Sequence, residues 1–432
     1  MGRAPNTPYA ASRYSAGGDG PVQQTAFIGQ AATRRRLLGG ALMAGGALAV
    51  PGLVRGQVLG TPSLVPMRLS PDQLVDMKCC LRPLRAAGPN LGTESVGGKL
   101  VVHNYGHGGS GWSLSWGSAE VAVGKALASL PRSVAVVGCG IIGLTSAVVA
   151  QRYGLDVTIY ARDQIARTRS FRASGSYTPG SRIALVEPAG PQFPDLWEQM
   201  ARHSWRMFRT MLGLPGEPVR FGDSYAVSDA PIERRTWPAD PAITESFATA
   251  GLPRQNSEFA HLDSRIADIV PQAVPLPPGE NPFGMPYATR SSQMHFNFPA
   301  YAAILLDEFF GRGGKFVNRV FHRPGELADL PEDVVIHATG YAARDFWGDR
   351  TVIPVRGQTG WLVPQPGVNY SLRYRNVSAL SKGDGIVIMN NNPDLGDMLG
   401  VGDSMELPNR APIEEAMATL AAIFARSAGA AA

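Results

Sequence analysis

The stretch "SVAVVGCGIIGLTSAVVAQRYG", from Ser133 to Gly154, predicts the fold of this chain. It opens with a short run of β-branched and apolar residues, continues into a glycine-rich loop, and then reads as a helix that closes at Gly154. A second apolar run, "DVTIYA" at 156–161, follows within the length of a βαβ unit. Because strand, G-x-G-x-x-G, helix and strand follow in this order, we expect an α/β protein with a Rossmann-type dinucleotide-binding sheet.

Each glycine of the loop has a mechanical role in binding a dinucleotide. The first allows a tight turn, the second lets the backbone approach a pyrophosphate, and the third lets helix and strand pack closely. The helix N-terminus then faces the phosphate charge. We therefore expect the whole loop to bind the cofactor: Gly138, Cys139, Gly140, Ile141, Ile142 and Gly143.

The end of the second strand leaves the choice of dinucleotide open. An acidic residue usually ends this strand and binds the adenosine ribose. Here Asp163 comes one position later than the simplest pattern, and Arg162 beside it could contact the adenosine side instead. Both side chains could also belong to a solvated strand end, so this pair alone does not choose between FAD and NAD(P).

The distribution of charge argues against a nucleic-acid-binding protein. The chain has 432 residues and a net charge of +5. Residues 1–56 contain six Arg and one Asp, so this segment carries the whole excess, and the remainder has 34 basic and 34 acidic residues. Because the net positive charge lies in the leader and the rest of the chain is neutral, the charge does not indicate binding to nucleic acid or another polyanion.

The leader contains "TRRRLLGGALMAGGALAVPGLVRG" from residue 33 to residue 56. The arginines at 34–36 followed by an uncharged, mildly apolar run look like a twin-arginine export signal, which implies the twin-arginine export machinery as a partner. We therefore expect a periplasmic or secreted protein. The alternative is an uncleaved leader that anchors the protein at the membrane.

The cysteines and histidines indicate neither a disulfide framework nor a metal site. Of the three cysteines, Cys79 and Cys80 are adjacent and Cys139 lies inside the glycine loop. His103 and His107 are four residues apart, but the glycines around His107 argue against the helix that would align them. We expect no bound metal, and we expect folding before export.

Several further segments together resemble the D-amino-acid oxidase family of FAD enzymes. The closest match is the glycine-rich flavin motif "HNYGHGGSGWSLSWG" at 103–117. The others are "CLRPLR" at 80–85, "SFRASGSYTPG" at 170–180, "DVVIHATG" at 333–340 and "PVRGQ" at 354–358. The resemblance implies FAD as the cofactor and a Rossmann-type FAD-binding domain beside a mixed-sheet α+β substrate domain.

The order of these segments differs from the family's order. The family runs from the dinucleotide loop to R-P-x-R and ends with H-N-Y-G-H-G-G, whereas here the last two elements come first. The cyclic order is kept, so the chain looks circularly permuted, which is tolerated when the old termini lie close together. The alternative is a gene-model or fusion artefact.

The resemblance implies roles for individual residues at the flavin and substrate. Arg82 would clamp the substrate carboxylate with its planar fork, and Tyr370 and Tyr374 would wall the substrate pocket, although paired tyrosines are also common packing residues. Arg85 is expected to be structural. Backbone N–H groups of the glycine run would stabilise charge on the reduced flavin, helped by the N-terminus of the helix that follows. The further residues expected at the cofactor are Gly108, Gly109, Ser110, Gly111, Ser113, Ser170, Gly175, Ser176, Phe321 and Thr339.

The resemblance also implies domain boundaries and an activity. We expect a leader at 1–56, an FAD-binding domain at 74–185 and 313–350, a substrate domain at 186–312 and 351–412, and a C-terminal helix and tail at 413–432. The expected reaction is oxidative deamination of a D-amino acid or related amine, with hydride transfer to flavin N5 and oxygen as electron acceptor. The alternatives are a flavin dehydrogenase that reduces a membrane acceptor and a non-catalytic flavoprotein.

Overall fold

The computed structural model describes residues 64–232, 258–391 and 396–430. All of them belong to one compact unit, Leu59–Ala432. The segment predicted to be a twin-arginine leader lies outside the described residues. Within the described ranges, no helix is both long enough and apolar enough to cross a membrane.

The first sheet is built around the predicted βαβ unit. Its strand order is β2-β3-β10-β4-β5-β9, and all neighbours are parallel except β2, which is antiparallel to β3. Strand β10 comes from late in the chain and inserts between β3 and β4, so segments on both sides of the dinucleotide loop share one sheet. The strands are β2 (Thr93–Val96), β3 (Lys99–His103), β4 (Ser133–Val137), β5 (Asp156–Ala161), β9 (Lys315–Asn318) and β10 (Val334–His337).

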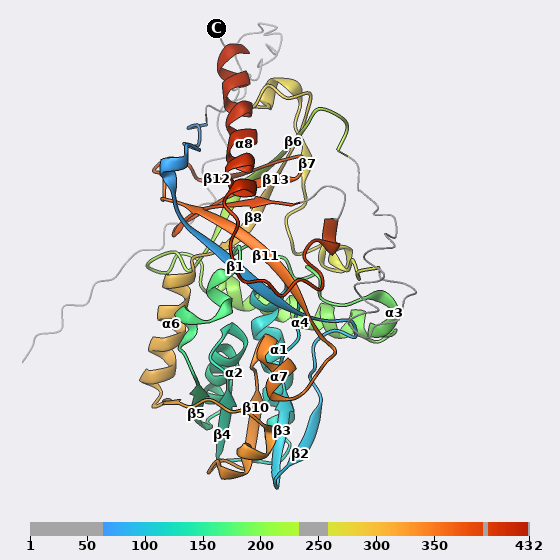
Figure 1. Cartoon of the computed structure of the whole chain (residues 1–432), viewed down its shortest axis with the longest axis vertical. Helices are drawn as coiled ribbons and strands as arrows, with labels where there is room; N and C mark the ends of the chain where they lie inside the picture. The colour runs from blue at the N-terminus through green and yellow to red at the C-terminus, as the bar shows by residue number, and fades with distance from the viewer. Residues whose placement is uncertain (1–63, 233–257, 392–395, 431–432) are drawn as a thin grey trace, which may run out of the picture. The chain divides into compact units, whose positions relative to one another are not determined.

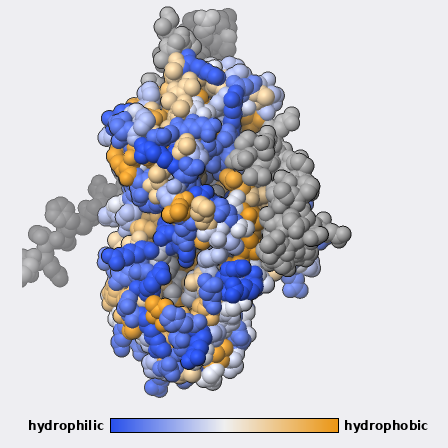
Figure 2. Space-filling model, viewed as in Figure 1, coloured by the Kyte–Doolittle hydropathy of each residue, from blue (hydrophilic) through white to orange (hydrophobic). Residues whose placement is uncertain are grey.

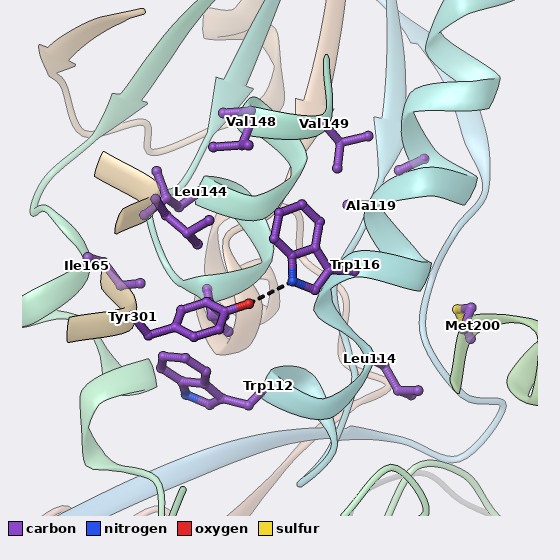
Figure 3. Close-up of a cluster of buried hydrophobic side chains, with 14 of the residues drawn as sticks. Trp112, Leu114, Trp116, Ala119, Leu144, Val148, Val149, Ile165, Met200 and Tyr301 are labelled. Atoms are coloured by element: carbon purple, nitrogen blue, oxygen red, sulfur yellow. Dashed lines mark hydrogen bonds between the residues drawn. The ribbon is translucent and has the colours of Figure 1, made fainter. Parts of the chain in front are cut away.

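Helices cover this sheet and enclose an aromatic core. Helices α1 (Gly111–Leu127) and α2 (Ile141–Arg152) pack on each other and on the strands, and α6 (Phe298–Gly311) packs on α2. The Trp116 indole N–H donates to the Tyr301 hydroxyl at 2.7 Å inside a cluster of buried apolar side chains (Figure 3). This hydrogen bond satisfies two polar groups that burial would otherwise penalise.

The second sheet is mixed and has the order β1-β11-β14-β13-β12-β6-β8-β7. Strands β1 and β11 run side by side as a long antiparallel pair, blue beside orange in Figure 1. Helix α8 (Ala411–Ala430) packs on β13 and β14. The strands are β1 (Leu74–Arg85), β6 (Val219–Ser228), β7 (Val274–Pro275), β8 (Tyr287–Phe296), β11 (Val352–Leu362), β12 (Tyr370–Tyr374), β13 (Val377–Lys382) and β14 (Gly385–Asn390).

The sheets correct one predicted domain boundary. Residues 74–85 were assigned to the FAD-binding domain, but they form β1 at the edge of the second sheet. The reason is the eleven-pair ladder with β11, which ties this segment to the later strand. The remaining α-helices of the described ranges are α3 (Val186–Ala189), α4 (Phe193–Arg209), which packs on α1, and α7 (Ala343–Phe346).

The visible face of the molecule in Figure 2 is largely hydrophilic. Apolar residues appear on it in small groups between hydrophilic ones, as is usual for the surface of a folded domain. The described residues of this face therefore show no large apolar patch of the kind that marks a binding surface.

Candidate active site

One cavity of about 400 Å³ brings together segments that are far apart in the sequence. Arg82, Gly109, Gly138 and Thr339, which were expected to border one cofactor, all line this cavity. The predicted residues at its wall are Arg82, Gly108, Gly109, Gly111, Gly138, Cys139, Gly140, Ile141, Ile142, Arg162, Asp163, Ser170, Phe321 and Thr339. Their contacts with a cofactor remain a prediction.

The dinucleotide loop joins β4 to α2 with the geometry expected from its glycines. Gly138 has φ 110°, and a Cβ there would lie 2.5 Å from the Ala338 carbonyl oxygen, so only glycine fits. Gly143 does not reach the cavity; a Cβ there would collide with the Gly138 carbonyl, so this glycine lets α2 pack onto the loop. The N-terminus of α2 therefore opens onto the cavity at Gly140 and Ile141.

Ser170 is placed at this helix N-terminus by a direct contact. The Ile141 N–H donates to Ser170 Oγ at 2.9 Å, and both residues line the cavity. The hydroxyl of Ser170 accepts from the helix and keeps its own proton for donation, so it can donate toward a phosphate oxygen. The predicted association of Ser170 with the cofactor thus has a concrete position beside the first turn of α2.

The end of β5 carries an ion pair at the cavity wall. Arg162 Nε lies 2.7 Å from Asp163 Oδ2, and both residues line the cavity. Arg319, which is not among the predicted residues, also lines the cavity, and its guanidinium lies over the Phe321 ring, 4.6 Å from the ring centroid. This end of the cavity therefore offers one acid and two guanidinium groups beside an aromatic face.

The glycine run of the second motif corrects one expectation. The N–H groups of Gly108, Gly109 and Ser110 already donate to the carbonyls of Pro83, Ser181 and His107, at 2.8, 2.9 and 2.9 Å. They are engaged in holding neighbouring segments and are not directed at a flavin. The free donors of this region are the N–H groups of the first turn of α1, because its first intrahelical bond runs from Leu114 to Ser110.

Ser110 and Ser113 support the cavity wall from behind. Ser110 Oγ donates to the Ser181 carbonyl at 2.9 Å, and Ser113 Oγ accepts from the Thr178 N–H at 2.8 Å. Both serines are buried and neither lines the cavity, which corrects the prediction of direct cofactor contact. They fix the segment 178–181, whose Thr178 and Ser181 do line the cavity.

Three buried polar atoms of cavity residues have no partner in the described part of the chain. They are Asn104 Oδ1, His107 Nε2 and Arg169 Nε. Burial lowers the pKa of His107 to about 3, so its imidazole is neutral. Buried polar groups are normally hydrogen-bonded, so these atoms suit a polar ligand inside the cavity. Asn104 and His107 both belong to the motif "HNYGHGG", but no local pattern indicates that their side chains are left without a partner.

The side chains of two cavity arginines, Arg82 and Arg167, have no partner among the described residues, and Arg82 is the less exposed of the two. The Arg82 guanidinium makes no ion pair or hydrogen bond with the described residues, and burial lowers its pKa. By contrast, Arg85 Nε lies 3.1 Å from Asp349 Oδ2, in keeping with the predicted structural role. An unpaired cation at a cavity wall is a ready binding group for an anion, and its planar fork suits a carboxylate.

The cavity as a whole is rich in positive charge. Its arginines include Arg167, Arg169 and Arg172 besides those already named, and Asp163 is the acid at its wall. Glu406 pairs with both Arg169 and Arg172, so part of this charge is neutralised from outside. The balance still favours a ligand with phosphates at one end and an acidic group at the other.

Both predicted pocket tyrosines lie elsewhere. Tyr370 is buried in the core of the second sheet and donates to the Val65 carbonyl at 2.9 Å, while Tyr374 donates to Asp229 Oδ2 at 2.5 Å. Neither lines the cavity, which corrects the prediction that they wall the substrate pocket. Their hydroxyls are satisfied by partners that do not line the cavity, so packing explains both residues.

Gly175 and Ser176 are also displaced from the cavity. Gly175 lies against the buried Lys382, where an added Cβ would come within 2.7 Å of the ammonium nitrogen. Ser176 bridges to His295 and lines a second cavity of about 360 Å³ behind the segment 174–178. Gly175 and Ser176 were expected at the cofactor, but neither residue lines the first cavity. Their near neighbours Ser174 and Thr178 do line that cavity.

The fold and the cavity place the chain among enzymes that use a dinucleotide cofactor. The chain belongs to the DAO family, FAD dependent oxidoreductase, whose family model matches residues 133–427. It is 29% identical over 231 residues to a D-amino-acid oxidase of Rubrobacter xylanophilus, a match that covers 52% of this chain and 57% of that protein. It is 26% identical over 242 residues to a D-amino-acid oxidase of Streptomyces coelicolor, covering 55% and 60%.

The chain thus spans less than two thirds of the length of these curated relatives. Among solved structures, it is similar to the L-proline dehydrogenase of P. horikoshii with 12% identity and a TM-score of 0.43, covering 67% of this chain and 76% of that one. The family makes FAD the cofactor and makes the chain an oxidoreductase.

The residues of the cavity fit FAD. The α2 N-terminus and the surrounding arginines suit a diphosphate, and the unpaired Asn104 Oδ1 and His107 Nε2 offer buried polar partners. No group of three or more His, Cys, Asp or Glu side chains that could hold a metal occurs in the part of the chain that the structure describes. The three cysteines, Cys79, Cys80 and Cys139, are free thiols.

Proposed function

We propose that this protein oxidises a D-amino acid or a closely related amine at the carbon that bears the amino group. The single observation that carries the proposal is the unpaired guanidinium of Arg82 in the cavity that also contains the dinucleotide loop. The loop at Gly138 would hold the phosphates of FAD, and Arg82 would bind a carboxylate in the same cavity. The names of the relatives, D-amino-acid oxidases, support the same substrate class.

Arg82 would bind and orient the substrate. Two parallel N–H···O bonds fix a carboxylate in one plane, and this orientation decides which face of Cα meets the flavin. Burial of the guanidinium strengthens such bonds because fewer water molecules compete for them. The Arg82 guanidinium packs directly against Gly357, and any larger residue at position 357 would place its Cβ in the space that the guanidinium occupies.

FAD supplies the hydride acceptor for the reaction. In the proposed reaction the Cα–H bond breaks, its electron pair leaves with the hydrogen, and a C=N bond forms from the amine, which gives an imino acid. Oxygen then takes the two electrons with two protons and becomes hydrogen peroxide. The chain itself contributes binding, orientation and positive charge, and no side-chain nucleophile is required.

Three further proposals concern the context of the enzyme. The arginine-rich leader supports twin-arginine export and a periplasmic or secreted location. The order of motifs supports circular permutation, because the family match begins at residue 133 while the flavin motif at 103–117 precedes it. Two ladders also support this proposal: β1 pairs with β11, and β3 pairs with β10. Each ladder joins a segment that precedes the dinucleotide loop to one that comes late in the chain.

Anaerobic mixing of the purified holoenzyme with panels of D- and L-amino acids tests the main proposal. We expect D-amino acids to bleach the oxidised-flavin absorbance, and the Arg82→Leu variant to retain FAD but lose the bleaching. A yellow protein that no amine bleaches would contradict the proposal and favour a non-catalytic flavoprotein. Peroxide formation on readmission of air separates an oxidase from a dehydrogenase, which would instead reduce an added dye.

A further inference from the structure

A continuous hydrogen-bonded chain joins the surface to the cavity through two buried histidines. Glu94 Oε1 lies 2.6 Å from His103 Nε2, and His103 Nδ1 lies 3.0 Å from His337 Nδ1. His337 Nε2 lies 2.7 Å from Thr339 Oγ1, and Thr339 lines the cavity. The two histidines meet because β3 and β10 are parallel neighbours with His103 and His337 in register.

The surroundings of the chain keep both imidazoles neutral. His103 and His337 are 3% and 0% exposed. Burial lowers the pKa of His103 although Glu94 opposes this, and burial together with His103 holds the pKa of His337 well below its ordinary value. A neutral imidazole donates from one ring nitrogen and accepts at the other.

The direction of every hydrogen bond then follows from Glu94. A carboxylate only accepts, so His103 Nε2 carries its proton, and Glu94 Oε1 also accepts from the Trp347 indole N–H at 2.9 Å. His103 Nδ1 is consequently bare, and His337 must donate from Nδ1. His337 Nε2 is then bare as well, and the Thr339 hydroxyl must donate to it.

In this arrangement the Thr339 hydroxyl donates its proton to His337 Nε2 and has none left to donate into the cavity. We propose that Glu94, His103 and His337 are positioning residues that make Thr339 Oγ1 an acceptor toward the cavity, where it receives a hydrogen bond from a sugar or ribityl hydroxyl of FAD. An acceptor repels phosphate oxygens, so this polarity separates the hydroxyl-bearing part of the cofactor from the diphosphate. The proposal rests on FAD binding, which the family establishes, and not on the proposed substrate.

The position of Thr339 suits this role. Its backbone nitrogen lies 3.2 Å from the point where a Cβ of Gly138 would stand, so it adjoins the loop that receives the diphosphate. In FAD the ribose and the ribityl chain flank the diphosphate, and both carry hydroxyl groups that can donate. Trp347 stacks on His337 with centroids 4.6 Å apart and keeps the imidazole in one orientation.

The opposite polarity is a definite alternative. If His103 carried both protons, it would donate to His337 Nδ1, His337 would donate from Nε2, and Thr339 would be free to donate into the cavity. The two arrangements therefore differ in the nitrogen of His337 that carries hydrogen, and a spectrum can distinguish them.

Nitrogen-15 NMR of the histidine-labelled full-length protein tests the polarity directly. The chain has seven histidines, and the signals of His337 are assigned by their loss in His337→Gln. We expect His103 to carry its proton on Nε2 and His337 to carry its proton on Nδ1, at neutral pH. A proton on His337 Nε2 would overturn the proposal, whatever the enzyme's activity.

Affinity for FAD tests the consequence. Thr339→Val removes the acceptor, and we expect apoprotein with this change to bind FAD about tenfold more weakly, the effect of one hydrogen bond. FAD analogues that lack a single ribose or ribityl hydroxyl are then compared; one of them should bind wild type and Thr339→Val equally. If all analogues and FAD itself bind the two proteins alike, Thr339 is not an acceptor for the cofactor.

Matched variants separate positioning from packing. His337→Gln keeps an acceptor for Thr339 and a donor for His103, so it should keep most of the FAD affinity, whereas His337→Leu should lose as much as Thr339→Val. Glu94→Gln changes a partly exposed side chain and should leave folding intact. Because its amide can also donate, we expect the His337 proton to be shared between the two nitrogens. A fixed Nδ1 proton in Glu94→Gln would show that Glu94 does not set the direction.

Discussion

The guanidinium of Arg82 occupies the space that a side chain at Gly357 would need. A Cβ on residue 357 would overlap a terminal nitrogen of Arg82, and the two residues lie on the paired strands β1 and β11. The glycine on one strand therefore defines where the guanidinium on the other can lie. The geometry of the proposed carboxylate clamp is a property of this pair and not of Arg82 alone.

Truncation of Arg82 should remove substrate binding and leave cofactor binding intact. Each charge-assisted hydrogen bond contributes about 1.5–3 kcal/mol, so Arg82→Leu should lower kcat/KM for a D-amino acid by roughly 100-fold or more. Arg82→Lys keeps the charge without the fork and should recover part of this loss. Kinetics are measured with FAD occupancy in each variant; full activity of Arg82→Leu at full occupancy would rule out the clamp.

Gly357→Ala should reproduce part of the Arg82 defect without touching Arg82. The added methyl group displaces the guanidinium, so the bound carboxylate is misoriented and kcat should fall with a smaller change in FAD affinity. The variant is compared with wild type by single-turnover flavin reduction. Unchanged reduction rates would mean that the guanidinium has another productive position.

Two helical glycines offer a matched test of the dinucleotide loop. A Cβ at Gly143 would collide with the Gly138 carbonyl, whereas one at Gly124 in α1 meets no atom within 4 Å. Gly143→Ala should therefore abolish or strongly weaken FAD binding, while Gly124→Ala should keep it and gain up to about 1 kcal/mol of stability from helix propensity. FAD titration and thermal unfolding of both variants provide the measurement. Equal FAD affinity in the two would contradict the assigned packing role.

The sequence predicts the dinucleotide loop well because its constraints are local. Spacing alone places Gly138 and Gly143 between a strand and a helix, and both have the roles that the spacing implies. Tyr370 and Tyr374 are four residues apart on β12 and so share a face, but period-two alternation does not say which face meets the cavity. That choice depends on the strands beside β12, which come from distant parts of the chain.

Other features of the site depend on neighbours that no local pattern reveals. The glycine run predicts N–H groups that are available to the flavin. In the structure the N–H groups of Gly108 and Gly109 donate to the carbonyls of Pro83 and Ser181, which belong to other segments. The contact between His103 and His337 exists because β10 inserts beside β3. Such contacts are decided by strand order, which the sequence of either strand does not contain.

Removal of the β12 hydroxyls should leave the chemistry unchanged. Tyr370→Phe and Tyr374→Phe each lose a hydrogen bond to a group outside the cavity, the Val65 carbonyl and Asp229 respectively. We expect kcat/KM within about twofold of wild type and a stability loss of about 0.5–1.5 kcal/mol. A large fall in kcat/KM with normal stability would return these tyrosines to the substrate pocket.

The Trp116–Tyr301 bond should show strong coupling in a double-mutant cycle. Trp116→Phe and Tyr301→Phe each leave a buried polar partner unsatisfied, which costs about 1–3 kcal/mol beyond any loss of packing. The double variant removes both polar groups and should be less destabilised than the sum of the single variants. Denaturant unfolding of the four proteins measures the coupling; additive losses would argue against the bond.

Lys382 should make stability rise with pH in the alkaline range. Burial lowers the pKa of Lys382 to about 8 despite the Asp384 carboxylate at 3.0 Å. The unfolded chain therefore binds more protons than the folded one above about pH 8, so the free energy of unfolding increases up to the ordinary lysine pKa, by roughly 3 kcal/mol in all.

The matched control for Lys382 is the double variant Lys382→Met/Asp384→Asn. It removes the buried cation together with its partner, so no unpaired carboxylate remains. If the buried ammonium is the cause, the free energy of unfolding of wild type minus that of this variant should increase as pH rises from 8 toward 10. A difference that stays constant over this range would show that Lys382 titrates normally.

The pairing of β1 with β11 bears on how the protein assembles during synthesis. The strand that carries Arg82 is synthesised before its ladder partner β11, and all described strands of the first sheet lie between the two in the sequence. Closing so long a loop is entropically costly and makes folding slow. The proposed carboxylate clamp can therefore form only after β11 has been synthesised. A nascent chain that has completed its dinucleotide loop still lacks the ladder partner of β1, and a chaperone could shield this strand.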